Sequence, residues 1–519
     1  KMKRFLRGQA NPLAVVGVLA PFAILASYSN SHINNNMPKI CKDLGISSSL
    51  GTWIANVEIL VIIATATMTA RLGEKFSISV IYTVGLGLFS IFNLLFVIPQ
   101  IQKSFYAILV LRALSAIGIG LSNPSAMPLS YQLVPPQKLS IIISGVTLCI
   151  PLGSLISSFV AGIVADAIGW YYMCVFAGAA GVLTTILVII KLPFNLPKNK
   201  NAKFDILGTI LLAVSTVSML LGLISLGKNA FMPKWAAAVV VLVGICIFAS
   251  FIVWCIKFSK VPIFAKPLFN KQLLLAEGIL LLISLASYGE RYILPYMFNN
   301  LFKDMSASNI GYCMMAGAGA CFIVSPLYNV VAKRLVVKYL LLSITIAFVV
   351  FETLMSFQIF WFPTIAVTVI ISVFTIGCYI AVQIASQNIT YNSVSKIYTS
   401  QVGVMNQLMS NFGHATGITI GVVLQGFYDG GKKTSKSFGS VTISFAALVI
   451  IGIIFSLFLQ IMKGERGRKG YSEMGAAMVK PLEENNDELV EKDEFEGEQK
   501  VTKAEKLLLF LAPTFDLGQ

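Results

Sequence analysis

The sequence has few charged residues and only two histidines for its length. Of its 519 residues, 12% are charged and 56% are hydrophobic, whereas soluble domains carry about 25% charged residues. A soluble enzyme, a disordered scaffold and a DNA-binding domain are excluded, because so much apolar surface cannot be hidden in one or two water-soluble cores. The sequence also lacks a nucleotide-binding loop and a metal-ligand spacing, and its eight cysteines form no Cys-x-x-Cys pair. We therefore expect no cofactor, no metal and no enzymatic activity.

The net charge of +16 is divided unevenly along the chain. Residues 463–519 hold nine basic and thirteen acidic side chains, so residues 1–462 carry +20. Basic loops beside anionic lipid headgroups explain this excess, and nucleic acid is not an expected partner. The polar composition of residues 463–519 predicts a largely disordered tail.

Fourteen apolar stretches are long enough to be transmembrane helices, since about 20 helical residues cross the ~30 Å hydrocarbon core. They predict an all-α integral membrane protein. The stretches lie near residues 13–33, 52–69, 78–98, 105–123, 140–163, 170–191, 205–227, 233–256, 272–297, 309–332, 337–357, 361–386, 401–426 and 441–462.

Basic residues predict the orientation of these stretches in the membrane. An even number of spans places both termini on one side, where the terminal segments and loops hold 23 Lys and Arg, against nine in the opposite loops. The positive-inside rule therefore predicts that both termini, including residues 1–12 and the tail, are cytoplasmic. The opposite loops are too short for an extracellular domain, so the function is expected to lie within the bilayer.

Cysteine labelling tests this orientation. Single cysteines at positions 197–203, in a background without the native cysteines, should not react with a membrane-impermeant maleimide added outside intact cells. A cysteine at Lys42, in the first opposite loop, should react. Labelling at 197–203 from outside would invert the topology.

The loop between the second and third stretches is a candidate gate. Residues 70–77 read ARLGEKFS, which places Arg71, Glu74 and Lys75 at a helix end. Such charges can close a relay at the cytoplasmic face, although an ordinary short basic loop would read the same way.

Two apolar stretches contain further candidate functional residues. Residues 111–120 read LRALSAIGIG, and an Arg within an apolar helix costs about 2.5–3.5 kcal/mol on insertion scales, so Arg112 is expected to face a cavity or pair with an acid. The stretch 140–163 contains Gly145, Pro151, Gly153 and Gly162. Small residues and a proline permit close helix packing and a hinge.

In this order, the three motifs resemble those of the major facilitator superfamily. Its loop signature is G-x-L-A-D-R-x-G, its fourth span carries R-x-x-x-x-x-G-x-G, and its antiporter motif is G-P-x-x-G-G, in which Ile150 and Ser154 here replace two glycines. Pro38, Trp53 and the segments 292–296 and 387–417 further resemble the fourteen-helix drug:proton antiporter branch.

This resemblance covers about residues 13–462 and implies an architecture. It implies two six-helix halves, 13–191 and 272–462, with two extra helices at 205–256 between them and a central cavity opened alternately by rocking. The sequence departs from the branch at Ser29, where an Asp is usual. It departs again at Lys333, where a cytoplasmic acid is expected.

Glu58 and Arg112 are predicted at a similar depth, about 10 Å from the outer boundary at ~1.5 Å per residue. Together with Ser29, Asn30 and His32 they could form one polar cluster from three spans. Glu58 could load and release a proton as Arg112 approaches and withdraws. The two could also form a permanent ion pair or contact substrate.

The second half contains its own intramembrane charges. Glu290 and Arg291 point about 100° apart on one helix, so at least one is expected to line the cavity, and Glu290 is a second candidate for proton coupling. Glu277 could extend toward water. The further cavity candidates are Tyr288, Arg291 and Tyr292, together with Glu352 and His414, for which the sequence identifies no partner.

The favoured function is secondary active transport of a small organic solute by alternating access, as proton-coupled efflux of amphipathic or cationic compounds. The expected partners are this solute, protons and the lipid bilayer, with a monomer acting in the plasma membrane. One alternative is uptake or facilitated transport of a nutrient such as an amino acid, a siderophore complex or a lipid. Another is a non-transporting receptor or scaffold. The absence of the first-span Asp favours both alternatives, and the retained acids favour transport.

Overall fold

The structure is a computed structural model, and it describes most of the chain between residues 10 and 459. Within these residues it is built of helices without strands. The predicted tail 463–519, Lys333 and most of the predicted N-terminal segment lie outside the described residues. The described residues are 10–134, 139–194, 196, 205–226, 232–259, 262–302, 305–332, 335–394, 398–428 and 434–459.

Each of the fourteen predicted stretches coincides with a long helix, which confirms the all-α membrane fold. The first six long helices are α1 (Pro12–Leu44), α2 (Ser48–Phe76), α3 (Ile78–Leu94), α5 (Phe105–Ser122), α7 (Leu139–Ala167) and α8 (Tyr172–Lys191), with the short α4 (Pro99–Gln102) and α6 (Ala126–Leu133) between them. The next two are α9 (Ile206–Ser225) and α10 (Lys234–Val253). The last six are α11 (Lys271–Leu301), α12 (Ala307–Ala332), α13 (Val337–Trp361), α14 (Ile365–Asn392), α15 (Thr399–Phe427) and α16 (Ser435–Phe458).

Among the described residues, thirteen helices are long and apolar enough to cross a membrane, and α15 is the predicted span that is not among them. Its 29 residues give a length of about 43 Å, which suffices to cross. This helix is more polar than the other spans because it contains Asn406, Ser410 and Asn411, which are buried inside the bundle. A helix packed against α11 and α2 need not present an apolar surface to lipid.

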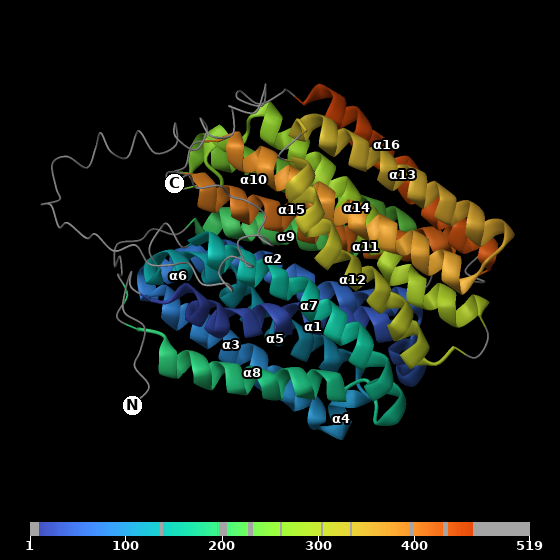
Figure 1. Ribbon diagram of the computed structural model, residues 1–519, viewed down its shortest axis with the longest axis horizontal. Helices are drawn as coiled ribbons and strands as arrows, with labels where there is room; N and C mark the ends of the chain where they lie inside the picture. The colour runs from blue at the N-terminus through green and yellow to red at the C-terminus, as the bar shows by residue number, and fades with distance from the viewer. Residues whose placement is uncertain are drawn as a thin grey trace, which may run out of the picture.

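The helices form two groups that are packed mainly within themselves (Figure 1). In the first group, α1 packs on α7 and α8, α3 packs on α5 and α8, and α2 packs on α5. In the second, α11 packs on α14, α15 and α16, α13 packs on α14 and α16, and α12 packs on α14. The groups meet where α7 contacts α12, α2 contacts α15 and α1 contacts α11.

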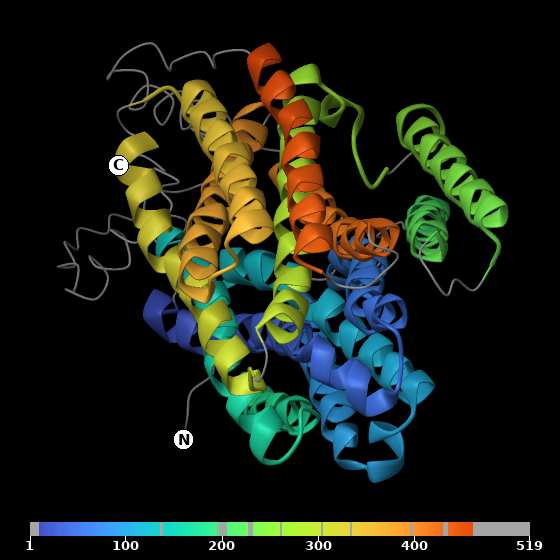
Figure 2. The same ribbon diagram turned by 90° about the vertical axis from the view of Figure 1, so that its right-hand side faces the viewer.

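The pair α9 and α10 stands to one side of the bundle (Figure 2). Asp205 caps α9 by accepting a bond from the Gly208 amide at 2.9 Å, and its carboxylate also accepts bonds from Trp254 Nε1 at 2.8 Å and Ser259 Oγ at 2.9 Å. These bonds tie the start of α9 to the residues that follow α10. Helix α10 is almost wholly apolar and packs mainly on α9, so most of its surface is left to face lipid.

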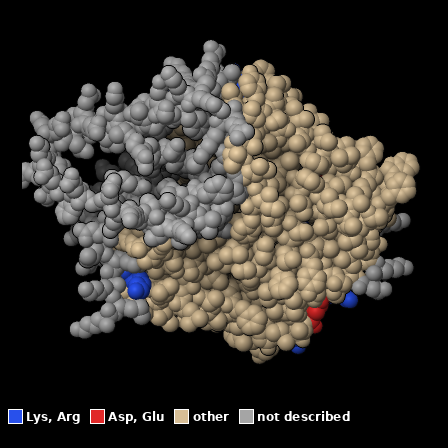
Figure 3. All heavy atoms as spheres, in the orientation of Figure 1, with Lys and Arg blue, Asp and Glu red and all other residues tan. Residues whose placement is uncertain are grey.

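One face of the molecule has a broad uncharged surface. In Figure 3 the charged side chains visible on this face lie near its margins, with uncharged residues between them. This distribution fits a lipid-facing belt, because charged side chains are costly in the hydrocarbon core.

Candidate functional site

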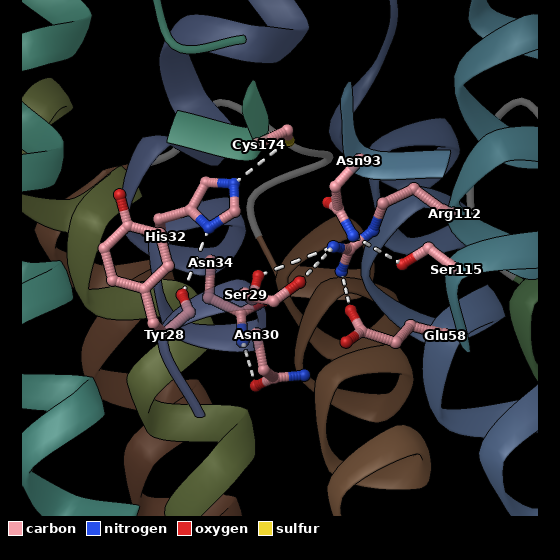
Figure 4. Close-up of polar contacts among 10 residues, drawn as sticks. All are labelled: Tyr28, Ser29, Asn30, His32, Asn34, Glu58, Asn93, Arg112, Ser115 and Cys174. Carbon is pink, nitrogen blue, oxygen red and sulfur yellow. Dashed lines mark hydrogen bonds and ion pairs between the residues drawn. The ribbon is translucent and has the colours of Figure 1, made fainter. Parts of the chain in front are cut away.

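The polar centre of the first helix group is an ion pair between Arg112 of α5 and Glu58 of α2 (Figure 4). Each side chain is 1% exposed. Arg112 Nη2 donates to Glu58 Oε2, while Arg112 Nη1 donates to the Ser29 hydroxyl of α1 at 3.2 Å and to the Ser29 carbonyl at 3.4 Å. The structure thus brings together three of the five residues expected in this cluster. Ser29 contacts the guanidinium at the position where the resembled branch has an Asp.

The ion pair is incompletely satisfied. Glu58 Oε1 and Arg112 Nε have no hydrogen-bond partner among the described residues. Beside them, Asn93 Nδ2 of α3 donates to Ser115 Oγ at 3.0 Å, and Asn93 Oδ1 is also unpartnered. Unpaired buried polar atoms lower stability, so the described arrangement leaves part of the hydrogen-bonding capacity of this centre unused.

Among the residues drawn in Figure 4, no hydrogen bond joins His32 or Asn30 to the ion pair. His32 Nδ1 lies 3.1 Å from the Tyr28 carbonyl and its Nε2 lies 3.3 Å from Cys174 Sγ of α8. Asn30 Oδ1 accepts a bond from Asn34 at 3.2 Å. Of the five residues expected in one cluster, Glu58, Arg112 and Ser29 are therefore in direct contact, while His32 contacts Cys174 of α8.

The antiporter-like stretch of α7 packs tightly against α1. A Cβ added at Gly153 would lie 2.2 Å from the Ile24 carbonyl oxygen, so only glycine permits this approach. Ser154, which replaces a glycine of the motif, lies 2.7 Å from Ser27 Oγ and accepts a bond from Ser31 Oγ at 2.9 Å. Hydrogen bonds thus accompany the close packing of α7 on α1. The surroundings of Gly145 are not described.

The two helix groups are joined at the end of the bundle that contains the turn between α1 and α2, which we call the α1–α2 end. Asp166 Oδ2, near the end of α7, accepts bonds from the Ser308 amide at 2.9 Å and the Ser308 hydroxyl at 2.7 Å at the start of α12. Lys39 of α1 pairs with Asp166 Oδ1 at 3.2 Å. Because α12 belongs to the second group, Asp166 is a latch between the groups, and its carboxylate favours the positive end of the α12 dipole.

Further contacts close this end. Asn56 of α2 donates to Thr419 of α15 at 2.7 Å, and Cys41 Sγ of α1 lies 3.2 Å from Tyr296 Oη of α11. The described conformation is therefore closed at the α1–α2 end.

The Asp166 latch predicts a conformational shift. Asp166→Asn removes the ion pair with Lys39 and the charge at the start of α12, each worth up to about 1 kcal/mol at such a partly exposed site. We expect the equilibrium constant for closure at the α1–α2 end to fall by up to about thirtyfold, because each kcal/mol lost changes it about fivefold. Spin-label distances between Ile168→Cys and Asn299→Cys, in a background without the native cysteines, measure this equilibrium.

Asp43→Asn is the matched control, since Asp43 is an exposed acid at the same end. Unchanged distances in Asp166→Asn would show that the latch does not set the equilibrium.

In the second group, Arg291 lies among aromatic rings. Its guanidinium is 5.2 Å from the ring centre of Tyr288 and 5.4 Å from that of Tyr379, which is cation–π geometry. The Tyr288 ring stacks on His414 at 3.4 Å, and His414 Nε2 lies 3.0 Å from Tyr379 Oη and 3.1 Å from Ser410 Oγ. His414 thus has the partners that the sequence could not identify, contributed by α14 and by its own helix.

The acids of the second group are deeply buried. Glu290 accepts a bond from Thr375 of α14 at 3.2 Å, and Glu352 of α13 is its neighbour, so Glu352 also has a partner that the sequence did not reveal. Glu277 is 2% exposed and neither of its oxygens has a hydrogen-bond partner in the described part of the chain. The expectation that Glu277 extends toward water is therefore wrong, because neighbouring helices cover it.

The remaining predicted positions have simpler surroundings. Tyr292 is buried, with its hydroxyl 3.5 Å from Tyr296 Oη, and Asn406 of α15 donates to Thr390 of α14 at 3.0 Å. At the predicted gate loop, the side chains of Arg71 and Glu74 are not described, and Lys75 lies 5.5 Å from the Phe76 ring centre.

Two groups of long apolar helices that enclose buried charges define a polytopic membrane transporter. A family model of the Major Facilitator Superfamily matches residues 19–418. The chain belongs to this superfamily.

Curated relatives are distant. Multidrug resistance protein 3 of Bacillus subtilis (strain 168) is 23% identical over 420 residues, 79% of each chain. The transporter YhcA of the same organism is 23% identical over 326 residues, 62% of this chain and 60% of the relative. The riboflavin transporter RibZ of Clostridioides difficile (strain 630) is 22% identical over 307 residues, 58% of this chain and 64% of the relative. The chain thus spans about three fifths of the length of YhcA and RibZ.

Solved structures share the fold. The peptide transporter POT in complex with sulfate has a TM-score of 0.64 at 15% identity, with coverage of 87% of this chain and 96% of that chain. The inward-open xylose transporter XylE from E. coli has a TM-score of 0.58 at 11% identity, with coverage of 89% and 100%.

Proposed function

We propose that this transporter exports a small amphipathic or cationic organic solute in exchange for protons. The buried ion pair between Glu58 and Arg112 carries this proposal. Charged side chains inside an apolar bundle cost free energy, and in membrane proteins they mark pathways for protons, ions or substrates. Relatives named as multidrug transporters support the solute class, although their identity is low. A plasma-membrane location and action as a monomer are part of the proposal.

The proposed coupling step is protonation of Glu58. A proton on the carboxylate removes its charge, which leaves Arg112 held by Ser29 alone and free to meet a new partner. When the ion pair re-forms, the proton is released. Glu58 would then give up its proton in one state of the cycle and accept it in the other, which is what exchange requires.

The proposed cycle uses the two helix groups, residues 13–191 and 272–462, as the moving halves. In the predicted orientation the α1–α2 end faces outside, so the conformation described above is closed to the outside, and in this proposal the solute enters from the cytoplasm. In this proposal the other candidates for solute contact lie along α1 and α11 and on the helices that face them: Asn30, His32, Tyr288, Arg291, Tyr292, Glu352 and His414.

Proteoliposomes with an imposed pH gradient test this function. Ethidium, an amphipathic cation, is supplied outside, and the membrane potential is held at zero with potassium and valinomycin. Exchange predicts that ethidium accumulates when the lumen is acidic and that a protonophore abolishes the accumulation. Accumulation only when the outside is acidic would indicate uptake with protons. No movement of ethidium under either gradient would contradict the proposed solute class.

A further inference from the structure

Glu290 and Glu352 form a carboxyl pair behind the aromatic cluster. Glu290 lies on α11, Glu352 on α13, and Thr375 of α14 donates to Glu290 Oε1 at 3.2 Å. All three side chains are at most 1% exposed. The two carboxyl groups are neighbours, close enough for each to act on the charge of the other. Two acids from different helices therefore meet in a dry part of the bundle.

This pair has few donors. Glu290 Oε2 and both oxygens of Glu352 have no protein donor among the described residues. An ionised carboxylate only accepts hydrogen bonds, so a bond between two carboxyls requires a proton on one of them. Two adjacent carboxylates in a low-dielectric site also repel one another too strongly for both to be ionised.

The summed charge of the two acids and their nearest base favours one bound proton. With both acids ionised the pair carries −2, and Arg291 on the next position of α11 contributes +1. One shared proton gives the three side chains a net charge of zero. Among the described residues, Arg291 forms no ion pair with either acid. The titratable groups nearby are Tyr288 and Arg291 on α11, Cys321 on α12, Tyr379 on α14 and His414 on α15.

We propose that Glu290 and Glu352 bind one transported proton between them and form a second proton site, in the helix group opposite the Glu58–Arg112 pair. This inference rests on the proposed exchange of solute for protons. On release, the shared proton passes from the carboxyl to water, and the pair can bear the resulting charge of −2 only with a compensating positive charge beside it. The second negative charge attracts Arg291, which is then drawn from between the rings of Tyr288 and Tyr379.

Infrared spectroscopy of the purified full-length protein tests the bound proton directly. Protonated carboxylic acids have a carbonyl stretch above the amide bands, and ionised ones do not. The buried and unpartnered Glu277 would contribute such a band, so Glu277→Gln is the background for every sample. In this background at neutral pH we expect one carboxylic-acid band, which shifts in heavy water.

The variants of the pair decide whether the proton is shared. We expect the band to be absent in Glu290→Gln, in Glu352→Gln and in the double variant, because a glutamine amide donates the bond that the proton supplied and lets the remaining acid ionise near Arg291. Glu58→Gln should leave the band unchanged, since Glu58 is paired with Arg112. A band that persists in the double variant, or in both single variants, would overturn the shared site. Stabilisation by sodium with no band would do the same, since it would indicate a cation site.

A second measurement separates this inference from the proposed function. Proton release into weakly buffered solution is measured when ethidium is added to the purified protein. We expect Glu352→Gln to release fewer protons than the wild type without losing release entirely, because Glu58 remains. Unchanged release would show that the paired proton is static and would overturn its role in transport. No release from the wild type, with the infrared band present, would instead contradict the proposed exchange.

Discussion

Removal of either partner of the Glu58–Arg112 pair alone is expected to destabilise the protein by about 3–5 kcal/mol, because it leaves an uncompensated buried charge. Glu58→Gln leaves the guanidinium without its carboxylate, and Arg112→Met leaves the carboxylate without its base while keeping the side-chain volume. The double variant should recover much of the loss, since a neutral pair of similar volume needs no desolvated charge.

The stability effects are measured as a double-mutant cycle in thermal unfolding, with transport measured on the same samples. We expect an interaction between the two sites in stability but no recovery of gradient-driven transport in the double variant, because the protonatable acid is gone. Glu277→Gln combined with Arg112→Met is the control cycle, and its effects should add because the two side chains are not partners. Additive effects in the Glu58–Arg112 cycle, with normal transport, would show that the residues neither interact in solution nor contribute to function.

A methyl group at Gly162 is expected to prevent closure of the α1–α2 end. A Cβ there would lie 2.2 Å from the Ala307 carbonyl oxygen and 2.4 Å from Ser308 Cα. Both are backbone atoms, so α7 and α12 must move apart. Overpacking of this kind costs about 1–3 kcal/mol, and only the conformation closed at this end bears the cost. Gly162→Ala should therefore shift the equilibrium toward opening at this end by about fivefold to 150-fold and slow transport.

Gly319→Ala is the matched control, because a Cβ at Gly319 would contact only Leu155 Cδ1 at 3.9 Å, an ordinary van der Waals distance. The same spin-label pair used for the Asp166 latch measures both variants. Closure of Gly162→Ala to the same degree as Gly319→Ala would mean that the close approach of α7 and α12 is not needed for the closed state.

The helices could be predicted from the sequence because a membrane allows few alternatives. Every backbone N–H and C=O group in hydrocarbon must form a hydrogen bond within its own helix. Apolar runs of sufficient length therefore predict helices directly. The Glu58–Arg112 pair could also be predicted, because two opposite charges at the same depth in hydrocarbon lower the cost of burial when they pair. Helix depth follows from residue number at ~1.5 Å per residue.

Contacts between helices that are distant in sequence could not be predicted in this way. Depth does not give rotation about the helix axis, so the sequence predicts His32 beside Arg112, whereas its ring contacts Cys174 of α8. The contact between Glu352 and Glu290 could not be predicted, because the two residues are 62 positions apart in the sequence and helix packing determines which faces meet. Asp166 lies just beyond the apolar stretch 140–163, and nothing in its local sequence indicates that the start of α12 lies beside it.

The coupling role of Glu58 is tested most directly by comparing ethidium accumulation with and without an acidic lumen in wild-type and Glu58→Gln proteoliposomes. The account predicts that the wild type accumulates ethidium only under the gradient. It predicts that Glu58→Gln loses most of this gradient dependence while still exchanging labelled for unlabelled ethidium at equilibrium. A Glu58→Gln protein with the accumulation of the wild type would contradict the account, because protonation of Glu58 could then not be the step that links solute movement to the proton gradient.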